Sequence, residues 1–339
     1  MSKRIMWLDS LKGLAIVLVV MGHVADGYLS AGTFPEYTKV FQYIYSFLYS
    51  FHMPLFLAVS GYVFYTAYCA RLREKQDRYV RQLINIGYIY IIFSVLQCVM
   101  KTLAAAMVNN SIGLKDFLLI PIKPVSPYWY LYFMLFYYVI FHTAEKYKVR
   151  VGICLAAAFA VSIAASCLKF DIVFPLRRMM LYVCFFYMGI FIAKTKEAAE
   201  PPKAVTYSCG AVCAAGVVLV AVFNKSLLTV PAIGIIIAAA AVILFIRLFS
   251  SVKALGENRL LVFLGGYSLE IYVIHCYVTA AGRAILPKLG ISNFALNFLL
   301  NTVIATVLPI LCAYILKKIR LHDLVFRPTE FFKKKEKSA

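Results

Sequence analysis

Ten long apolar runs follow one another along this chain of 339 residues and decide what it can fold into. They cover approximately residues 8–28, 43–69, 79–107, 127–143, 149–168, 179–193, 205–223, 230–249, 260–281 and 294–316. A helix needs about 20 residues to cross the hydrocarbon core of a bilayer. With 63% hydrophobic and only 15% charged residues, a soluble globule could not bury so much apolar surface. The sequence predicts an all-α polytopic membrane protein with about ten transmembrane helices.

The basic residues indicate how these helices are oriented. Lys and Arg outnumber Asp and Glu by 35 to 15, which gives a net charge of +20. In a soluble chain this excess would suggest nucleic acid, but here it lies in the loops between apolar runs, so we expect no nucleic-acid partner. Ten spans with a cytoplasmic N-terminus place most of these charges inside, as the positive-inside bias requires. We therefore expect both termini in the cytoplasm, a single membrane domain at 1–320, and a basic tail at 321–339 that is solvated or lies on anionic lipid.

The nine cysteines lie in or at the ends of the apolar runs. None forms a Cys-x-x-Cys pair or a Cys/His cluster with the spacing of a metal site. Free cysteine packs as a small hydrophobic residue, so we expect no metal ion here.

Ionisable groups inside spans are costly, and each is therefore a functional hypothesis. In the first run, Lys12 and His23 are eleven residues apart, which puts them on one helix face with a rise of about 16 Å. Asp26 follows one turn later and is placed to orient the His23 imidazole. A neutral imidazole is suited to act as a general base. The plainer alternatives are an interfacial lysine and a hydrogen-bonded packing histidine.

The second run and the loop after it hold further candidates. Pro54 should kink the helix and free a carbonyl beside His52, whose plainer role is to satisfy that kink. Arg73 lies in the basic loop that follows, and Arg78 and Arg81 share a helix face at its end. Guanidinium groups bind phosphates by paired hydrogen bonds, whereas the alternative is ordinary positive-inside bias.

The remaining candidates lie on the predicted outer side and in the ninth run. Trp129 opens the fourth run, and the Arg177–Arg178 pair opens the sixth. They suit a sugar site, although aromatic residues also form interfacial belts. Glu270 and His275 lie in the ninth run, where Glu270 requires a partner, for which Lys12 or an arginine is the obvious choice.

Four of these motifs together resemble the acyltransferase-3 family of membrane-bound acyltransferases. The pattern Lys-x10-His at Lys12 and His23 is similar to the family's basic-x10-His motif. The segment from Phe51-His52-Met53-Pro54 to Ser60-Gly61-Tyr62 resembles its second-helix signature. Arg78-x-x-Arg81 matches its cytoplasmic Arg-x-x-Arg. Residues 268–275 resemble its late Ser-x-x-Ile-Tyr-x-x-His block. In length and in the lack of appended domains, the chain is most similar to the fucose 4-O-acetylase group.

The resemblance implies an acyl-CoA donor, acetyl-CoA by default, and a glycan or lipid-linked sugar acceptor. No permanently bound cofactor is implied. It makes His23 the catalytic histidine with Lys12 as its basic partner, and Arg78 and Arg81 the donor-binding arginines. Lys12 replaces the arginine of many relatives and lacks its bidentate fork. The family also implies a bacterial cytoplasmic membrane. The roles of Arg73, Asp26, Trp129, Arg177, Arg178, Glu270, His52 and His275 rest on position alone.

Two other classes of function remain open from the residues. A transporter or flippase for a glycan or acyl intermediate would use the same intramembrane charges as a substrate path. A structural subunit of an envelope complex would need none of them. Direct transfer with His23 as base and a covalent acyl-histidine are both chemically possible.

Overall fold

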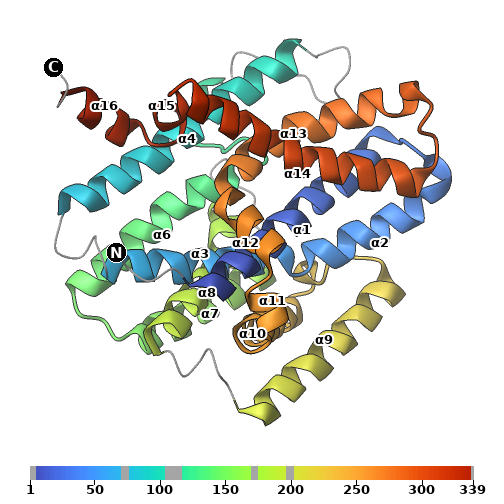
Figure 1. Ribbon diagram of the computed structural model, residues 1–339. Coiled ribbons are helices and arrows are strands. Elements are labelled where there is room, and N and C mark those ends of the chain that lie inside the picture. The colour runs from blue at the N-terminus through green and yellow to red at the C-terminus, as the bar shows by residue number, and fades with distance from the viewer. Residues whose placement is uncertain (1–4, 70–75, 104–116, 169–174, 196–201, 337–339) are drawn as a thin grey trace. The chain divides into compact units, whose positions relative to one another are not determined.

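A computed structural model describes residues 5–69, 76–103, 117–168, 175–195 and 202–336. All regular structure in these segments is helical. The α-helices are α1 (Met6–Ala31), α2 (Thr38–Tyr49), α3 (His52–Ala67), α4 (Gln76–Leu103), α6 (Trp129–Lys146), α7 (Val151–Cys167), α8 (Leu176–Thr195), α9 (Lys203–Phe223), α10 (Ile233–Ser251), α11 (Lys253–Gly256), α12 (Arg259–Gly266), α13 (Ser268–Ile285), α14 (Phe294–Lys318), α15 (His322–Phe326) and α16 (Pro328–Glu336) (Figure 1).

The helices confirm an all-α polytopic membrane protein. In the described part of the chain, seven helices are long and apolar enough to cross a membrane. The bent pair Lys253–Gly266 and Ser268–Ile285 makes an eighth span if it is counted as one. The runs at 127–143 and 149–168 also form helices, α6 and α7, and α7 has only 17 residues. The count of ten spans and the side of each terminus stay predictions.

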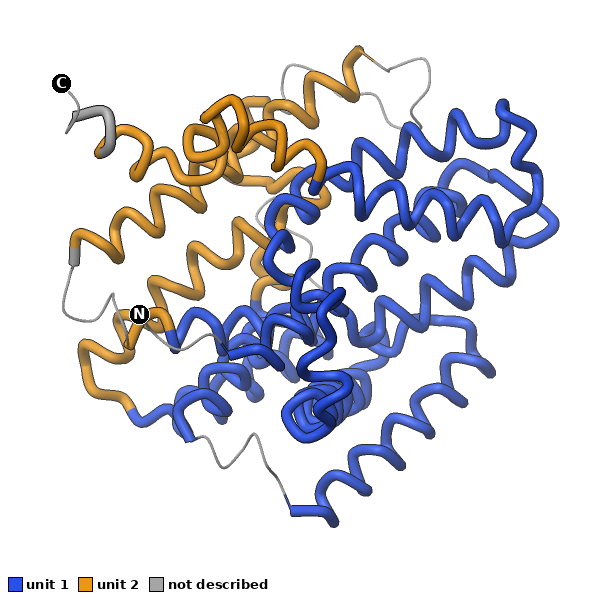
Figure 2. Tube along the Cα trace, viewed as in Figure 1, with its two compact units in different colours: residues 1–66, 150–169, 180–310 blue, residues 67–149, 170–179, 311–339 orange. Residues whose placement is uncertain are grey.

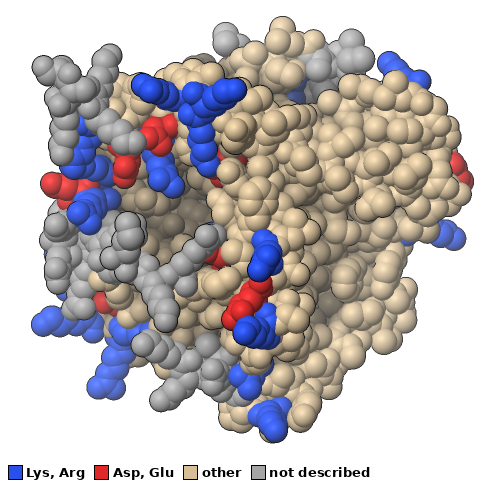
Figure 3. All heavy atoms as spheres, viewed as in Figure 1, with Lys and Arg blue, Asp and Glu red and all other residues tan. Residues whose placement is uncertain are grey.

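The surface has the character that lipid contact requires. Much of the right half of the view in Figure 3 is almost free of charged side chains, and most Lys and Arg lie elsewhere. Helix α14 exposes apolar side chains along its length, including Leu299, Val307 and Leu311, each at least half exposed. In water such a face would be unfavourable, but against lipid tails it costs nothing.

The chain forms two compact units (Figure 2). The first unit comprises residues 1–66, 150–169 and 180–310, and α1 packs there against α2, α10, α12 and α13. Glycines bring its helices into backbone contact. A Cβ at Gly13 of α1 would overlap the carbonyl oxygen of Leu261, and one at Gly265 of α12 would overlap that of Asp9. Gly61 and Gly189 do the same between α3 and α8, since small residues let helix backbones approach closely.

The predicted kink in the second run is present, four residues before Pro54. Helix α2 ends at Tyr49 and α3 begins at His52. The ring of a proline clashes with the carbonyl of the residue four positions earlier, here Ser50. His52 Nδ1 donates to the carbonyl oxygen of Leu48 at 2.5 Å, and that oxygen also accepts from the backbone N–H of Phe51 at 3.1 Å. His52 thus has a backbone partner at the break, but that partner is not the Ser50 carbonyl that Pro54 frees.

The run at 260–281, expected to be one helix, is broken instead. Helices α12 and α13 meet at Tyr267 with a bend of 62°. The break follows Gly265 and Gly266, and Gly265 is held against the backbone of α1. Because glycine is a poor helix former, the chain turns there at little cost. Thus α12 and α13 can each follow a different part of α1.

The second unit comprises residues 67–149, 170–179 and 311–339. Its helices α4 and α6 pack together, and tyrosine hydroxyls tie them to loop carbonyls, as Tyr132 does to Pro121 at 2.8 Å. The segment expected as a free basic tail is helical through residue 336 and packs on α4. The Thr329 backbone N–H and its hydroxyl both donate to Asn85 Oδ1, at 3.2 and 3.0 Å. The boundary at residue 320 stays a prediction.

Candidate active site

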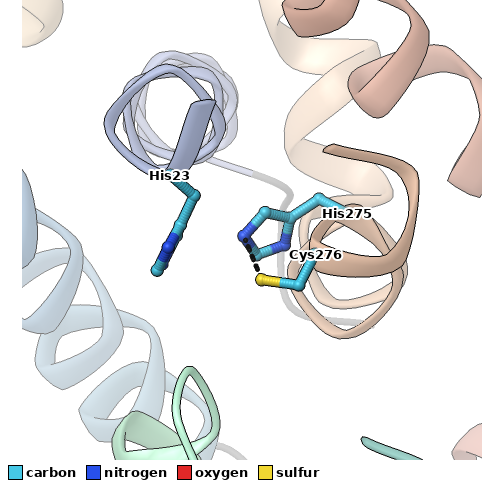
Figure 4. Close-up of side chains that lie close together, drawn as sticks. All are labelled: His23, His275 and Cys276. Atoms are coloured by element: carbon cyan, nitrogen blue, oxygen red, sulfur yellow. Dashed lines mark hydrogen bonds between the residues drawn. The ribbon is translucent and has the colours of Figure 1, made fainter. Parts of the chain in front are cut away.

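His23 and His275 face each other in the first unit. His23 lies on α1 and is half-buried, whereas His275 lies on α13 and is fully buried. Their ring centroids are 5.0 Å apart (Figure 4). Within the described residues, neither ring nitrogen of His23 makes a hydrogen bond to the protein. The imidazole of His23 thus keeps a nitrogen available to a bound molecule.

Hydrogen bonds fix the tautomer of His275. Its Nδ1 lies 2.7 Å from the carbonyl oxygen of Tyr272 and 3.1 Å from that of Ile271. A carbonyl only accepts, so Nδ1 carries the proton and Nε2 presents a lone pair. That Nε2 lies 3.2 Å from Cys276 Sγ, which makes the thiol its donor. The expectation that no cysteine joins a Cys/His cluster is therefore wrong for Cys276.

His52 and Tyr49 adjoin His23 from the break between α2 and α3. The ring centroid of Tyr49 is 4.7 Å from that of His52 and 6.4 Å from that of His23. His52 Nδ1 donates to the backbone, and its buried Nε2 has no partner among the described residues. Gly22 makes this packing possible, because a Cβ there would lie only 3.2 Å from the Tyr49 ring.

Asp26 does not orient His23 in the described structure. No hydrogen bond joins the two side chains there, although they lie one turn apart on α1. The charged partner of Asp26 is Arg283 of α13, with which it interacts electrostatically. Gly27 gives Arg283 room, since a Cβ at Gly27 would overlap its guanidinium. Asp26 and Arg283 thus form an oppositely charged pair one turn beyond His23.

Lys12 lies apart from His23. Its Nζ is 3.0 Å from Asp9 Oδ1, within the same helix. Asp9 is therefore a partner of Lys12, and the identity of the cation paired with Glu270, for which Lys12 or an arginine was expected, stays a prediction. Glu270 is buried in the first turn of α13. An ion pair one turn apart on a helix forms without any tertiary contact, so local pairing satisfies Lys12 first.

The predicted donor-binding arginines belong to the second unit. Arg78 is exposed and Arg81 half-buried, both near the start of α4. Tyr79 between them is buried and stacks on His142 of α6, with ring centroids 4.3 Å apart. His142 Nδ1 is hydrogen-bonded to the Tyr68 hydroxyl at 2.9 Å. The start of α4 is thus firmly anchored. Arg73 lies outside the described residues.

The second unit also brings together two residues predicted to bind the acceptor. The Arg178 guanidinium lies over the Trp129 ring, with Cζ 5.6 Å from the centroid. Arg177 is half-buried beside it at the start of α8. A planar cation over an indole face is a stable arrangement, so the pair forms one preorganised surface.

Sequence reasoning missed Cys276, Tyr49 and Arg283. Cys276 follows His275 directly, and this adjacency was a signal in the sequence. Tyr49 and Arg283 carry no local signal, because their positions depend on the packing of α1 against α2 and α13.

Comparison with known proteins agrees with this helical arrangement. The model of the acyltransferase-3 family, described as an acyltransferase domain, matches residues 5–318. A nodulation protein, NolL, of Sinorhizobium fredii is 29% identical over 203 residues, which cover 58% of this chain. The match spans about half the length of that relative, 50%. No solved structure matches. Since the family model covers nearly the whole described chain, this multi-pass membrane protein belongs to the acyltransferase-3 family.

Proposed function

We propose that the protein transfers an acetyl group from cytoplasmic acetyl-CoA to a hydroxyl of an extracytoplasmic or lipid-linked glycan. It would act in the cytoplasmic membrane of a bacterium, in the manner of fucose 4-O-acetylases. Membership of an acyltransferase family supports the reaction class. The donor, the acceptor and the membrane are part of the proposal.

The availability of His23 is the observation that carries this proposal. Its ring nitrogens make no hydrogen bond to the described protein, and it is half-buried. The nearby His275 and His52 each bind backbone carbonyls through Nδ1. Of these three histidines, His23 alone is therefore free to meet a substrate through either nitrogen. A base must lie within hydrogen-bond reach of the proton that it removes.

The reaction proceeds by direct transfer. His23 removes the proton of the acceptor hydroxyl as the oxygen attacks the thioester carbonyl. The carbon–sulfur bond then breaks, and the leaving thiolate of coenzyme A takes the proton from the His23 imidazolium. The products are the acetyl ester and coenzyme A, and the neutral imidazole is restored.

The two substrates are assigned to different residues. Arg78 and Arg81 bind phosphates of coenzyme A, because guanidinium groups pair with phosphate oxygens by two parallel hydrogen bonds. Asp26 and Arg283 hydrogen-bond hydroxyls of the acceptor one turn from His23, since a carboxylate accepts and a guanidinium donates. Trp129 and Arg178 offer a flat surface on which a sugar ring can stack.

Transfer by the purified full chain tests the proposal. Radiolabelled acetyl-CoA is incubated with the protein in liposomes and a panel of sugars and lipid-linked sugars. Label in an acceptor is the expected result. Slow release of coenzyme A without any acceptor would also support an acyl-CoA enzyme. Movement of sugar across the bilayer without acetyl-CoA, with no label transferred, would overturn the proposal in favour of a transporter.

A further inference from the structure

His23, His275 and Cys276 direct their donor atoms into one small space (Figure 4). One ligand atom from each lies within 4.8 Å of the other two. Two imidazoles and a thiolate are ligands that Zn²⁺ and similar soft divalent ions prefer. We propose that these three residues form a binding site for such an ion.

The hydrogen bonds of His275 prepare it for this role. A histidine that binds a metal through one nitrogen usually donates its other N–H to a carbonyl or carboxylate. His275 does so through Nδ1, toward the Tyr272 carbonyl at 2.7 Å. Its Nε2 lone pair is thereby directed at Cys276 and toward His23. The lone pair would bind a metal ion without any change of tautomer.

The distances require only a small adjustment. Bonds of about 2.0–2.3 Å in a tetrahedral site place ligand atoms roughly 3.3–3.8 Å apart. His275 Nε2 and Cys276 Sγ are already 3.2 Å apart. His23 has to approach by at most about 1.5 Å, and it gives up no hydrogen bond to the described protein when its ring turns. On binding, the Cys276 thiol loses its proton to solvent, and the thiolate replaces the S–H···N contact with a metal bond.

The cluster supplies three protein ligands and leaves a fourth position for water. His52 lies close enough to His23 to interact with it electrostatically. It is fully buried, and its Nε2 has no partner among the described residues. An unpaired buried nitrogen is costly, and a metal-bound water within its reach would satisfy it.

A metal ion bound at this site would inhibit the proposed acetyl transfer. A metal ion bound by His23 would occupy the lone pair that removes the acceptor proton. The inference depends on the geometry of the three side chains and not on His23 being a base. It can therefore be tested without a donor or an acceptor.

Cobalt titration of the full chain in detergent tests the site. Co²⁺ substitutes for Zn²⁺ and gives a thiolate-to-cobalt absorption band in the near ultraviolet. The variants are Cys276→Ser, which removes the thiolate, and Cys312→Ser, which removes a half-buried cysteine of α14 outside the cluster. Loss of even an outer-shell partner weakens metal binding about 10–100-fold. Cys276→Ser should therefore abolish the band and weaken Co²⁺ binding by at least about tenfold.

The expected result is one band that Zn²⁺ displaces, that survives in Cys312→Ser and that is lost in Cys276→Ser. His23→Gln should retain a weaker thiolate band with altered visible absorption, because one nitrogen ligand is lost. Thermal unfolding and size-exclusion profiles equal to wild type show that each variant is folded. Absence of a band in the wild type, or an unchanged band in folded Cys276→Ser, would overturn the proposal.

Discussion

Replacing Gly13 by alanine tests whether backbone contact between α1 and α12 holds the first unit together. The added Cβ would overlap the carbonyl oxygen of Leu261 and would lie within about 3 Å of the Leu261 carbonyl carbon and Gly265 N. These atoms belong to a backbone and cannot turn away as a side chain would. Overpacking of this kind typically costs about 1–3 kcal/mol. Gly13→Ala should lower the free energy of unfolding by that amount, less the roughly 0.5–1 kcal/mol that alanine gains over glycine within a helix.

Gly210→Ala is the matched control. Gly210 lies within α9, and a Cβ there meets nothing within 4 Å. Alanine is a better helix former than glycine by roughly 0.5–1 kcal/mol, so Gly210→Ala should be neutral or slightly stabilising. Because both variants gain this helix propensity, they should differ by the overpacking cost alone, about 1–3 kcal/mol. Unfolding in mixed micelles, followed by tryptophan fluorescence, measures this difference. Trp7 is a useful probe because it lies on α1 against Tyr62, with ring centroids 5.3 Å apart. Equal stability of the two variants would refute the reasoning.

Three further predictions concern function. Arg78→Ala and Arg81→Ala should each raise the KM for acetyl-CoA about 10- to 100-fold, since a hydrogen bond to a charged group contributes about 1.5–3 kcal/mol; Lys146→Ala is the control, and an unchanged KM in both arginine variants would remove them from the donor site. Gly27→Ala should displace the flexible Arg283 side chain and so raise the KM for the acceptor. The melting temperature should stay close to that of the wild type. An unaltered acceptor KM would show that Arg283 does not bind the acceptor. Zn²⁺ should inhibit wild-type transfer and a chelator should restore it, whereas Cys276→Ser should need about tenfold more Zn²⁺ for the same fractional loss of its own rate; equal sensitivity would argue against a metal site at Cys276.

The apolar runs predicted the helices well because membrane helices are determined by local composition. The run at 8–28 lies within α1, and Pro54 marked the break between α2 and α3 in advance. The break at Tyr267 was not predicted. Gly265 and Gly266 are visible in the sequence, but the contact of Gly265 with α1 is not. A helix end that depends on contact with a backbone distant in sequence cannot be predicted from the residues around that end.

The candidate site shows the same division. The sequence identified His23, His52 and His275, because an ionisable group in an apolar run is conspicuous. It did not predict that the rings of His23 and His275 lie 5.0 Å apart across α1 and α13. It also did not predict the pairing of Lys12 with Asp9, which lies one turn away on the same helix. The contact between His23 and His275 could not be predicted because the two residues are far apart along the chain. The partner of Lys12 could not be predicted because several acidic groups could lie near it in the fold.

The rate of acetyl transfer by His23→Ala tests the central claim most directly. His322→Ala is its matched control, because His322 is a buried histidine of α15. General-base catalysis contributes about 10²–10⁴-fold. We predict a loss of that size in a folded His23→Ala protein and near wild-type transfer in His322→Ala. Equal transfer by wild type and His23→Ala would contradict the account and would move the search for the base to His275 or His52.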